Sequence, residues 1–166
     1  KEERITNAFL VPTMLRRVVE YARNTPGALD LPALKAIAYG GGKMPLKIIE
    51  DAMELLPHVD FTNAYGLTET SSTICLLTPA AHHAAHASTD PLIRRRLTSV
   101  GQAIPAIEMQ IRSEDGALCA PDETGLVFVR GDQVSGEYKG LGSGLDSNGW
   151  FPTRDRGFVD GDGFLF

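Results

Sequence analysis

Two buried-strand patterns on either side of a helix constrain this fold more than any other feature. The stretch LKAIAY, residues 34–39, is short, apolar and uninterrupted, which is typical of a strand buried on both faces of a parallel sheet. A helical pattern follows that begins near Pro45 and ends at Pro57, and HVDFTNAYG, residues 58–66, has the pattern of a second strand. Together they predict a strand–helix–strand unit over 36–64, with parallel strands and a right-handed crossover.

The segments around this unit differ in period. Residues 12–24 place apolar side chains at helical spacing behind Pro12, which predicts an amphipathic helix. Residues 78–98 are polar and rich in alanine and histidine, and they lack a firm period. For this second segment we predict a surface loop with at most one short helix.

Beyond Gly101 the pattern becomes β-rich. Apolar and polar residues alternate over 107–112, GLVFVRG (125–131) predicts a further strand, and SNGW and DGDG have the chemistry of turns. The predicted fold class is therefore α/β, with a parallel portion over residues 1–100 and a smaller β-rich lobe over 101–166.

Composition excludes several classes of function. The 166 residues are 43% hydrophobic and 22% charged, which is ordinary for one soluble domain or two small lobes. The formal net charge of −5 provides no basic surface of the kind that nucleic acid requires, and we interpret the arginines at 94–96 as a solvated face. The 2 cysteines have no Cys-x-x-Cys spacing, so they indicate neither a disulfide framework nor a zinc site and favour a reducing cytoplasm.

The two ends of the chain lack the usual signals. No run approaches the roughly 18 apolar residues that span a bilayer, and KEERITNAFL at the N-terminus lacks the apolar stretch of a signal peptide. The first residue is Lys1 rather than Met, and the apolar residues 164–166 stop without a turn or cap. We expect a cytoplasmic protein, of which this sequence is a piece.

Small and polar residues gather where each predicted strand ends. Gly40, Gly41 and Gly42 follow the first strand, and YGLTET, residues 65–70, closes the second. In open α/β sheets ligands bind at the carboxyl ends of the strands, so we expect these two segments to lie together.

The YGLTET motif has the groups that a nucleotide polyphosphate needs. Tyr65 offers a flat face for a base, and Gly66 allows close backbone approach. Thr68 offers a hydroxyl, and Glu69 offers the hard oxygen that Mg²⁺ prefers. A structural alternative is equally open on spacing alone: Gly66 makes a turn, and Thr68 with Glu69 caps a following helix.

A second candidate lies in GWFPTRDRGFVDGDGFLF, residues 149–166. The Asp155 carboxylate could accept hydrogen bonds from both hydroxyls of a ribose, although a surface salt-bridge cluster with Arg154 and Arg156 is the simpler interpretation of that residue alone. DGDG is better explained as a β-turn than as a calcium loop. The histidines at 82, 83 and 86 lack further ligands at suitable spacing, which disfavours a metal site.

Five motifs in one order resemble the adenylate-forming superfamily of acyl-CoA synthetases, luciferases and peptide-synthetase adenylation domains. They are VPTMLRRVV, YGGGKMP, NAYGLTET, SVGQAIPAIEMQI and GWFPTRDRGFVDGDGFLF. The resemblance spans essentially the whole chain. It implies part of a large N-terminal domain, in which residues 1–100 belong to an α/β subdomain and residues 101–166 to a β-barrel subdomain.

The resemblance implies a reaction and a role for each motif residue. Enzymes of this superfamily join a carboxylic acid to ATP, giving acyl-AMP, and pass the acyl group to a thiol, usually that of coenzyme A. By resemblance Tyr65 stacks on adenine beside Gly66, Thr68 contacts the α-phosphate, Glu69 holds Mg²⁺ and Asp155 binds the ribose. Gly40, Gly41 and Gly42 line the adenine and acyl pocket. YGGGKMP with YGLTET is closer to fatty-acyl and aryl-acid ligases than to amino-acid adenylating modules.

Three departures from the family pattern leave alternatives open. Arg154 replaces the glycine of Thr-Gly-Asp, and Leu126 stands where Gly-Glu is usual. The phosphate loop is expected before Lys1 and the catalytic lysine after Phe166, so we expect the piece alone to be inactive. The alternatives are a peptide-synthetase adenylation domain, a luciferase-like enzyme, or a regulatory nucleotide-binding domain without catalysis, for which Arg154 would be the hint.

Overall fold

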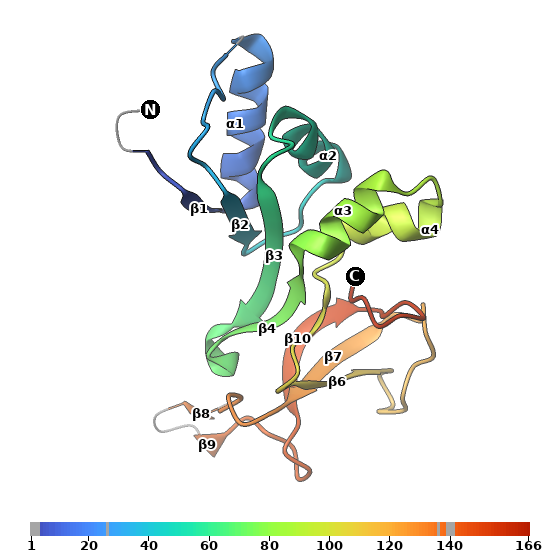
Figure 1. Ribbon diagram of the computed structural model, residues 1–166. Coiled ribbons are helices and arrows are strands. Elements are labelled where there is room, and N and C mark those ends of the chain that lie inside the picture. Colours follow the sequence, from blue (N-terminus) through green and yellow to red (C-terminus); the bar gives the residue numbers. More distant parts are fainter. Residues whose placement is uncertain (1–3, 26, 136, 139–141) are drawn as a thin grey trace. The chain divides into compact units, whose positions relative to one another are not determined.

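The computed structural model describes residues 4–25, 27–135, 137–138 and 142–166 (Figure 1). The chain divides into two compact units, Lys1–Ala64 with Leu77–Ser99, and Tyr65–Leu76 with Val100–Phe166. The division places YGLTET in the same unit as everything after Ser99. The assignment of residues 1–100 and 101–166 to two family subdomains stays a prediction.

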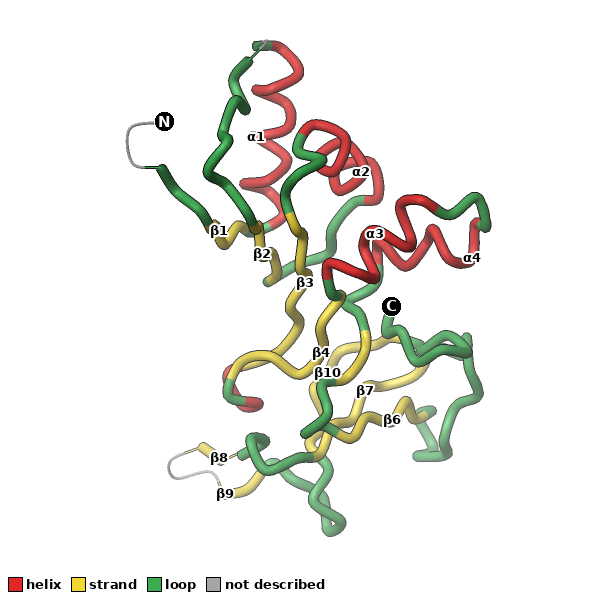
Figure 2. Tube along the Cα trace, viewed as in Figure 1, coloured by secondary structure: helices red, strands yellow, loops and turns green. Residues whose placement is uncertain are grey.

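The first unit contains the predicted strand–helix–strand arrangement, which is confirmed. Strands β1 (Asn7–Leu10), β2 (Ala36–Gly40) and β3 (Asp60–Leu67) pair in parallel, with Ala36 opposite Asp60 and Gly40 opposite Ala64. Helices α1 (Pro12–Asn24) and α2 (Leu46–Leu55) lie alongside these strands in Figure 2. Pro12 is the first residue of α1, where a missing N–H is harmless, and α2 ends before Pro57.

The core of the first unit forms where the helices meet the strands. It contains Leu15 and Val19 of α1, Ile49 of α2, Tyr39 of β2 and Phe61 of β3, all at most 3% exposed. Each fully buried large apolar side chain contributes about 1.5–3 kcal/mol to stability. This core fixes the end of β2, from which Gly40, Gly41 and Gly42 emerge.

The prediction of a surface loop over residues 78–98 is wrong. The segment forms α3 (Pro79–Ala87), α4 (Pro91–Arg94) and the short 3₁₀ helix η2 (Arg95–Thr98). The Thr78 hydroxyl accepts a hydrogen bond from the Ala81 N–H, and alanine is the strongest helix former. His82 and Leu97 are fully buried, so this segment also contributes to the core.

The second unit contains the β-rich segment predicted beyond Gly101, together with Tyr65–Leu76. Strands β6 (Glu108–Arg112), β7 (Gly125–Arg130) and β10 (Phe151–Gly157) form an antiparallel sheet in the order β10-β7-β6. Strand β4 (Ser72–Leu77) pairs with β5 (Gln102–Ala103), and β8 (Glu137–Tyr138) pairs with β9 (Gly142–Ser143). The core of this unit consists of mostly aliphatic side chains: Ile74, Cys75, Ile107, Ile111, Val127, Val129, Val134, Phe151 and Leu165.

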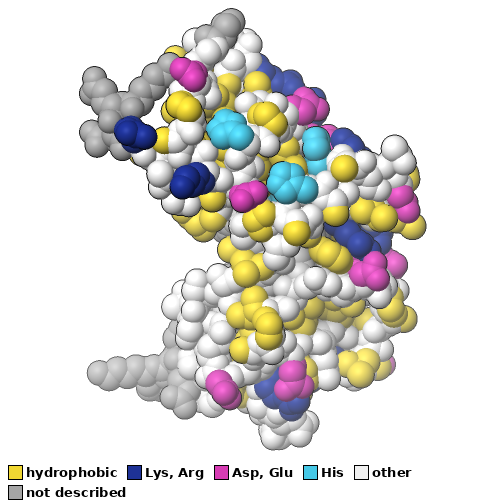
Figure 3. Space-filling model, in the orientation of Figure 1, with side chains coloured by type: hydrophobic (Ala, Val, Ile, Leu, Met, Phe, Trp, Pro, Cys, Tyr) yellow, Lys and Arg dark blue, Asp and Glu magenta, His cyan; other side chains and the backbone are white. Residues whose placement is uncertain are grey.

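Two global properties of the described residues bear on function. No helix among them is both long and apolar enough to cross a membrane. On the face of the described residues that Figure 3 shows, lysine and arginine side chains do not gather in one continuous patch.

Candidate functional site

Tyr65 and Asp155 meet although they are 90 residues apart in the sequence. Tyr65 lies near the end of β3, Asp155 lies on β10, and both belong to the second unit. The Tyr65 Oη donates a hydrogen bond of 2.6 Å to the Asp155 Oδ2. Burial raises the pKa of the Tyr65 phenol, and the Asp155 carboxylate raises it further, so the phenol keeps its proton and remains a donor.

A local irregularity of β10 presents Asp155 to solvent. The pairing of β10 with β7 shifts register between Pro152 and Arg156, and Arg154 has φ +69, in the left-handed region. The buried Thr153 hydroxyl donates to the Val127 carbonyl (2.9 Å) and accepts from the Asp155 N–H (3.2 Å). Asp155 is thus exposed while its backbone is tied to the sheet.

The sharp connection between β3 and β4 explains Gly66. A Cβ at this position would lie 1.6 Å from the Ser72 carbonyl oxygen, so only glycine fits. The 3₁₀ turn η1 (Thr68–Thr70) follows directly, and β4 begins at Ser72. The alternative in which Thr68 and Glu69 cap a following helix is therefore wrong, because the chain turns back into a strand.

Buried hydrogen bonds hold this turn in place. The fully buried Thr70 accepts from the Leu67 N–H at 3.0 Å. The Gln133 side-chain amide donates to the Thr70 carbonyl at 2.8 Å and to the Thr73 carbonyl at 2.9 Å. Sequence reasoning missed Gln133, since nothing in its local sequence marks a contact 60 residues away. The clamped turn leaves Thr68 exposed and Glu69 half-buried.

The three glycines at the end of β2 lie in the first unit, with Gly40 as the last residue of the strand. A Cβ on Gly40 would lie 2.3 Å from the Ala64 carbonyl oxygen of the neighbouring strand, and Gly41 has φ +75. Both positions therefore require glycine, whereas Gly42 has open space around it beyond Pro12 at 3.9 Å. That these glycines share a site with Tyr65, Thr68, Glu69 and Asp155 stays a prediction.

A family model described as "AMP-binding enzyme" matches residues 1–139 of this chain. The chain belongs to the AMP-binding enzyme family. The resemblance to the adenylate-forming superfamily is thereby confirmed.

The relatives of this chain include proteins named as acid–CoA ligases. It is 34% identical over 170 residues to the 2-succinylbenzoate–CoA ligase of Bacillus licheniformis, covering 100% of this chain and 31% of that protein. The amide bond synthetase McbA from Marinactinospora thermotolerans matches with a TM-score of 0.80 and 30% identity over 99% of this chain and 31% of that one. The o-succinylbenzoate CoA synthetase of Bacillus subtilis, solved with an acyl-adenylate intermediate, matches with a TM-score of 0.75 and 28% identity over 99% and 31%.

These matches confirm the predicted fold class, but they cover only part of each relative. The chain spans less than a third of the length of these relatives, 31% of each. The activities for which the relatives are named are those of proteins about three times as long as this chain.

The donor set of the described residues limits how a metal could be held. In the part of the chain that the structure describes, no group of three or more His, Cys, Asp or Glu side chains is placed to hold an ion. The single Glu69 carboxylate nevertheless fits Mg²⁺, which binds through one or two carboxylates together with substrate phosphates. His82 is not a ligand candidate, since its Nε2 lies 2.7 Å from Tyr39 Oη and its Nδ1 lies 3.0 Å from the Thr78 carbonyl.

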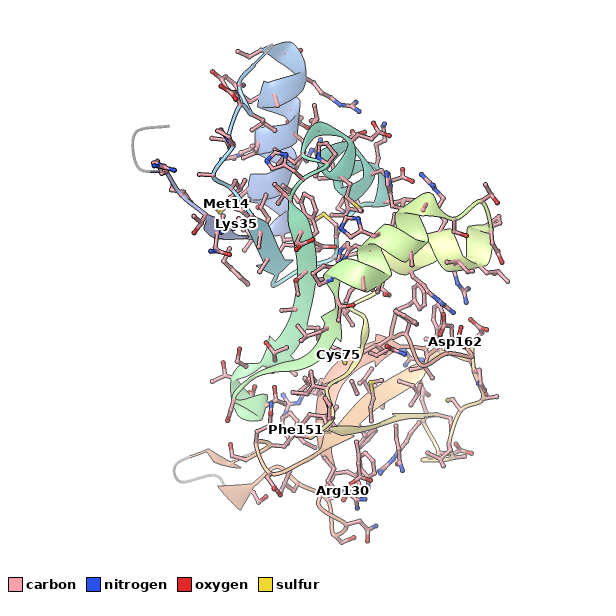
Figure 4. All side chains as sticks on the ribbon, in the orientation of Figure 1. Met14, Lys35, Cys75, Arg130, Phe151 and Asp162 are labelled. Atoms are coloured by element: carbon pink, nitrogen blue, oxygen red, sulfur yellow. The ribbon has the colours of Figure 1, made fainter. Side chains whose placement is uncertain are left out.

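A surface depression in the second unit is lined by none of the residues Tyr65, Thr68, Glu69 and Asp155. It has a volume of about 510 Å³ and is lined by β6, by connecting segments and by Arg130 of β7, which Figure 4 labels. The Arg112 and Arg130 guanidiniums stack on the buried Trp150 ring and also pair with Asp146 and Glu108. These arginines are already neutralised, so we assign the cluster a role in holding the sheet together.

Proposed function

We propose that the protein with this sequence activates a carboxylic acid with ATP and transfers the acyl group to coenzyme A. In the first step a carboxylate oxygen attacks the α-phosphorus, the bond to the bridging oxygen breaks, and pyrophosphate leaves. In the second step the thiol sulfur attacks the acyl carbonyl, the thiol proton is lost, and AMP leaves. Family membership supports this reaction class, and the contact between Tyr65 and Asp155 is the observation that carries the assignment.

The Tyr65–Asp155 contact supports a nucleotide site because it joins the two groups that a nucleoside needs. The Tyr65 ring offers a stacking face for adenine, which is worth about 1–3 kcal/mol in other base–aromatic contacts. The Asp155 carboxylate is exposed beside it and can accept from a sugar diol. One hydrogen bond of 2.6 Å joins the two side chains, so they lie close enough to contact the base and the sugar of one nucleoside.

The remaining motif residues take roles around the phosphates and the acyl group. Thr68 would donate to the α-phosphate, and Glu69 would hold Mg²⁺ together with phosphate oxygens. Bound there, the metal supplies neutralisation of the phosphate charge that builds up in the transition state. Gly40, Gly41 and Gly42 would leave room for the flat base and the acyl chain.

The acyl substrate is proposed as a fatty or aryl acid. Relatives of this chain are named as ligases of 2-succinylbenzoate, indoleacetate and fatty acids. Coenzyme A is the proposed acceptor because several of these names include it, while one relative is named for transfer to acyl-carrier protein.

The test is pyrophosphate exchange into ATP by the full-length protein with a panel of carboxylic acids. We expect exchange that depends on a fatty or aryl acid. Glu69→Gln should lower its rate at least about tenfold and raise the Mg²⁺ concentration needed, because one metal ligand is weakened. Glu54→Gln, on the exposed side of α2, is the matched control and should change neither. Exchange that is indifferent to Glu69→Gln would remove Glu69 from its role.

A second candidate, nucleotide binding without catalysis, is favoured by Arg154 alone. This cation replaces the family glycine next to Asp155, yet the left-handed backbone that a glycine would adopt is kept. ATP binding without exchange for any acid, together with exchange gained by Arg154→Gly, would support the silent domain.

A further inference from the structure

The Asp155 side chain is exposed, yet its position is fixed from two sides. Its backbone N–H donates to the Thr153 hydroxyl at 3.2 Å, and that hydroxyl donates to the Val127 carbonyl of the neighbouring strand. Its Oδ2 accepts from the Tyr65 hydroxyl at 2.6 Å. An exposed carboxylate usually samples several rotamers, so a second anchor on the side chain itself restricts it.

The nearby cations leave this arrangement in place. Arg156 pairs with Glu114 at 3.1 Å instead of with Asp155. The left-handed Arg154 turns the backbone between Thr153 and Asp155 while both of these neighbours stay hydrogen-bonded. The salt-bridge cluster that the sequence alone suggested is therefore not the main contact of Asp155.

The bond between Tyr65 and Asp155 is of the stronger kind. A distance of 2.6 Å falls within the short range of O–H···O⁻ bonds to an ionised acceptor, which are roughly twice as strong as neutral ones. A carboxylate has two oxygens with several lone pairs, so Tyr65 occupies part of Oδ2 and leaves Oδ1 for a ligand.

We propose that the Tyr65 hydroxyl is a positioning group for the Asp155 carboxylate and orients it toward the vicinal diol of a nucleotide sugar. The inference rests on the proposed function, because it takes the ligand to be a nucleotide. It goes beyond that function by giving Tyr65 two separate tasks: the ring stacks on the base, and the hydroxyl prepares the diol acceptor. Recognition of the base and recognition of the sugar are then coupled through one side chain.

The test separates the hydroxyl from the ring. Tyr65→Phe keeps the ring and removes the hydroxyl, and the affinities of the full-length protein for ATP and for 2′,3′-dideoxy-ATP are measured by calorimetry. We expect Tyr65→Phe to weaken ATP binding about tenfold, as for one hydrogen bond to a charged group, and to leave dideoxy-ATP binding within about twofold. Tyr21→Phe removes an exposed phenol hydroxyl from α1 and should change neither affinity.

A second variant tests whether the effect runs through Asp155. Asp155→Asn should itself weaken ATP selectively, and adding Tyr65→Phe to it should produce less than about a twofold further loss, because the two residues act as one unit. Melting temperatures of all variants show that each is folded.

The outcomes discriminate between the inference and the function on which it rests. Equal weakening of ATP and dideoxy-ATP by Tyr65→Phe, or no weakening of either, overturns the positioning role while leaving a nucleotide site in place. Full additivity of Tyr65→Phe and Asp155→Asn overturns it as well. Failure of the wild-type protein to bind either nucleotide overturns the proposed function and this inference together.

Discussion

Replacing Arg154 by glycine is expected to stabilise the protein through its backbone. Arg154 has φ +69, where a residue with a Cβ is strained by about 1–2 kcal/mol. Glycine relieves this strain, but its greater freedom in the unfolded chain offsets about 0.4–1 kcal/mol of the gain. Compared with Arg154→Ala, which loses the same guanidinium and keeps the strain, Arg154→Gly should be more stable by about 1 kcal/mol, or roughly 3 °C in melting temperature.

Thermal unfolding followed by circular dichroism measures this difference. The matched control is Arg17, an exposed residue within α1 whose backbone is helical. There the order should reverse, with Arg17→Gly less stable than Arg17→Ala by about 1 kcal/mol, because glycine is a poor helix former. An Arg154→Ala variant at least as stable as Arg154→Gly would show that this backbone is not strained.

Two further predictions concern the turn after β3 and the buried histidine. Gly66→Ala should destabilise the protein by at least about 3 kcal/mol in urea unfolding, because its Cβ would lie 1.6 Å from the Ser72 carbonyl oxygen. Gly161 has open space around it, so Gly161→Ala is the control and should change stability by less than about 1 kcal/mol. Burial lowers the pKa of His82 to about 4 from 6.5, so the folded protein favours the neutral imidazole. The stability that His82 contributes is therefore present above pH 6.5 and is lost as the pH falls toward 4. The free energy of unfolding is measured from pH 7 to pH 4, and it should fall by up to about 3 kcal/mol more in the wild type than in His82→Gln. The exposed His83→Gln is the control and should follow the wild type. Parallel curves for the wild type and His82→Gln would refute this role of His82.

The parallel unit could be predicted because its strands are short, continuous apolar runs and its helices begin or end at prolines. The helices over residues 79–98 could not be found in this way, since alanine and histidine give no hydrophobic period. Their signals were nevertheless local: Thr78 before Pro79 and Asp90 before Pro91 each place a capping side chain ahead of a proline. The capping residues therefore mark the starts of α3 and α4, which the hydrophobic period does not.

For the candidate site, the sequence predicts the types of residue but not the contact between them. The types of residue in YGLTET and around Asp155 indicated a nucleotide, but the contact between Tyr65 and Asp155 depends on the register of β10, which shifts within the motif itself. Spacing in the sequence carries no information on such a shift. The family resemblance supplied both residues, and only the fold shows that they touch.

The residues proposed to touch ligand and those that hold them in place are physically distinct. Thr68 and Asp155 are exposed, whereas Thr70 and Thr153 are buried, and their hydroxyls form hydrogen bonds with backbone groups. Buried hydroxyls bound to backbone leave little freedom to the residues beside them, so the ligand-facing groups need little reorganisation when a nucleotide arrives. On this reasoning Thr153→Val, which keeps the shape and removes the hydroxyl, should weaken ATP binding without any loss of a direct contact, because the backbone of Asp155 would lose its anchor.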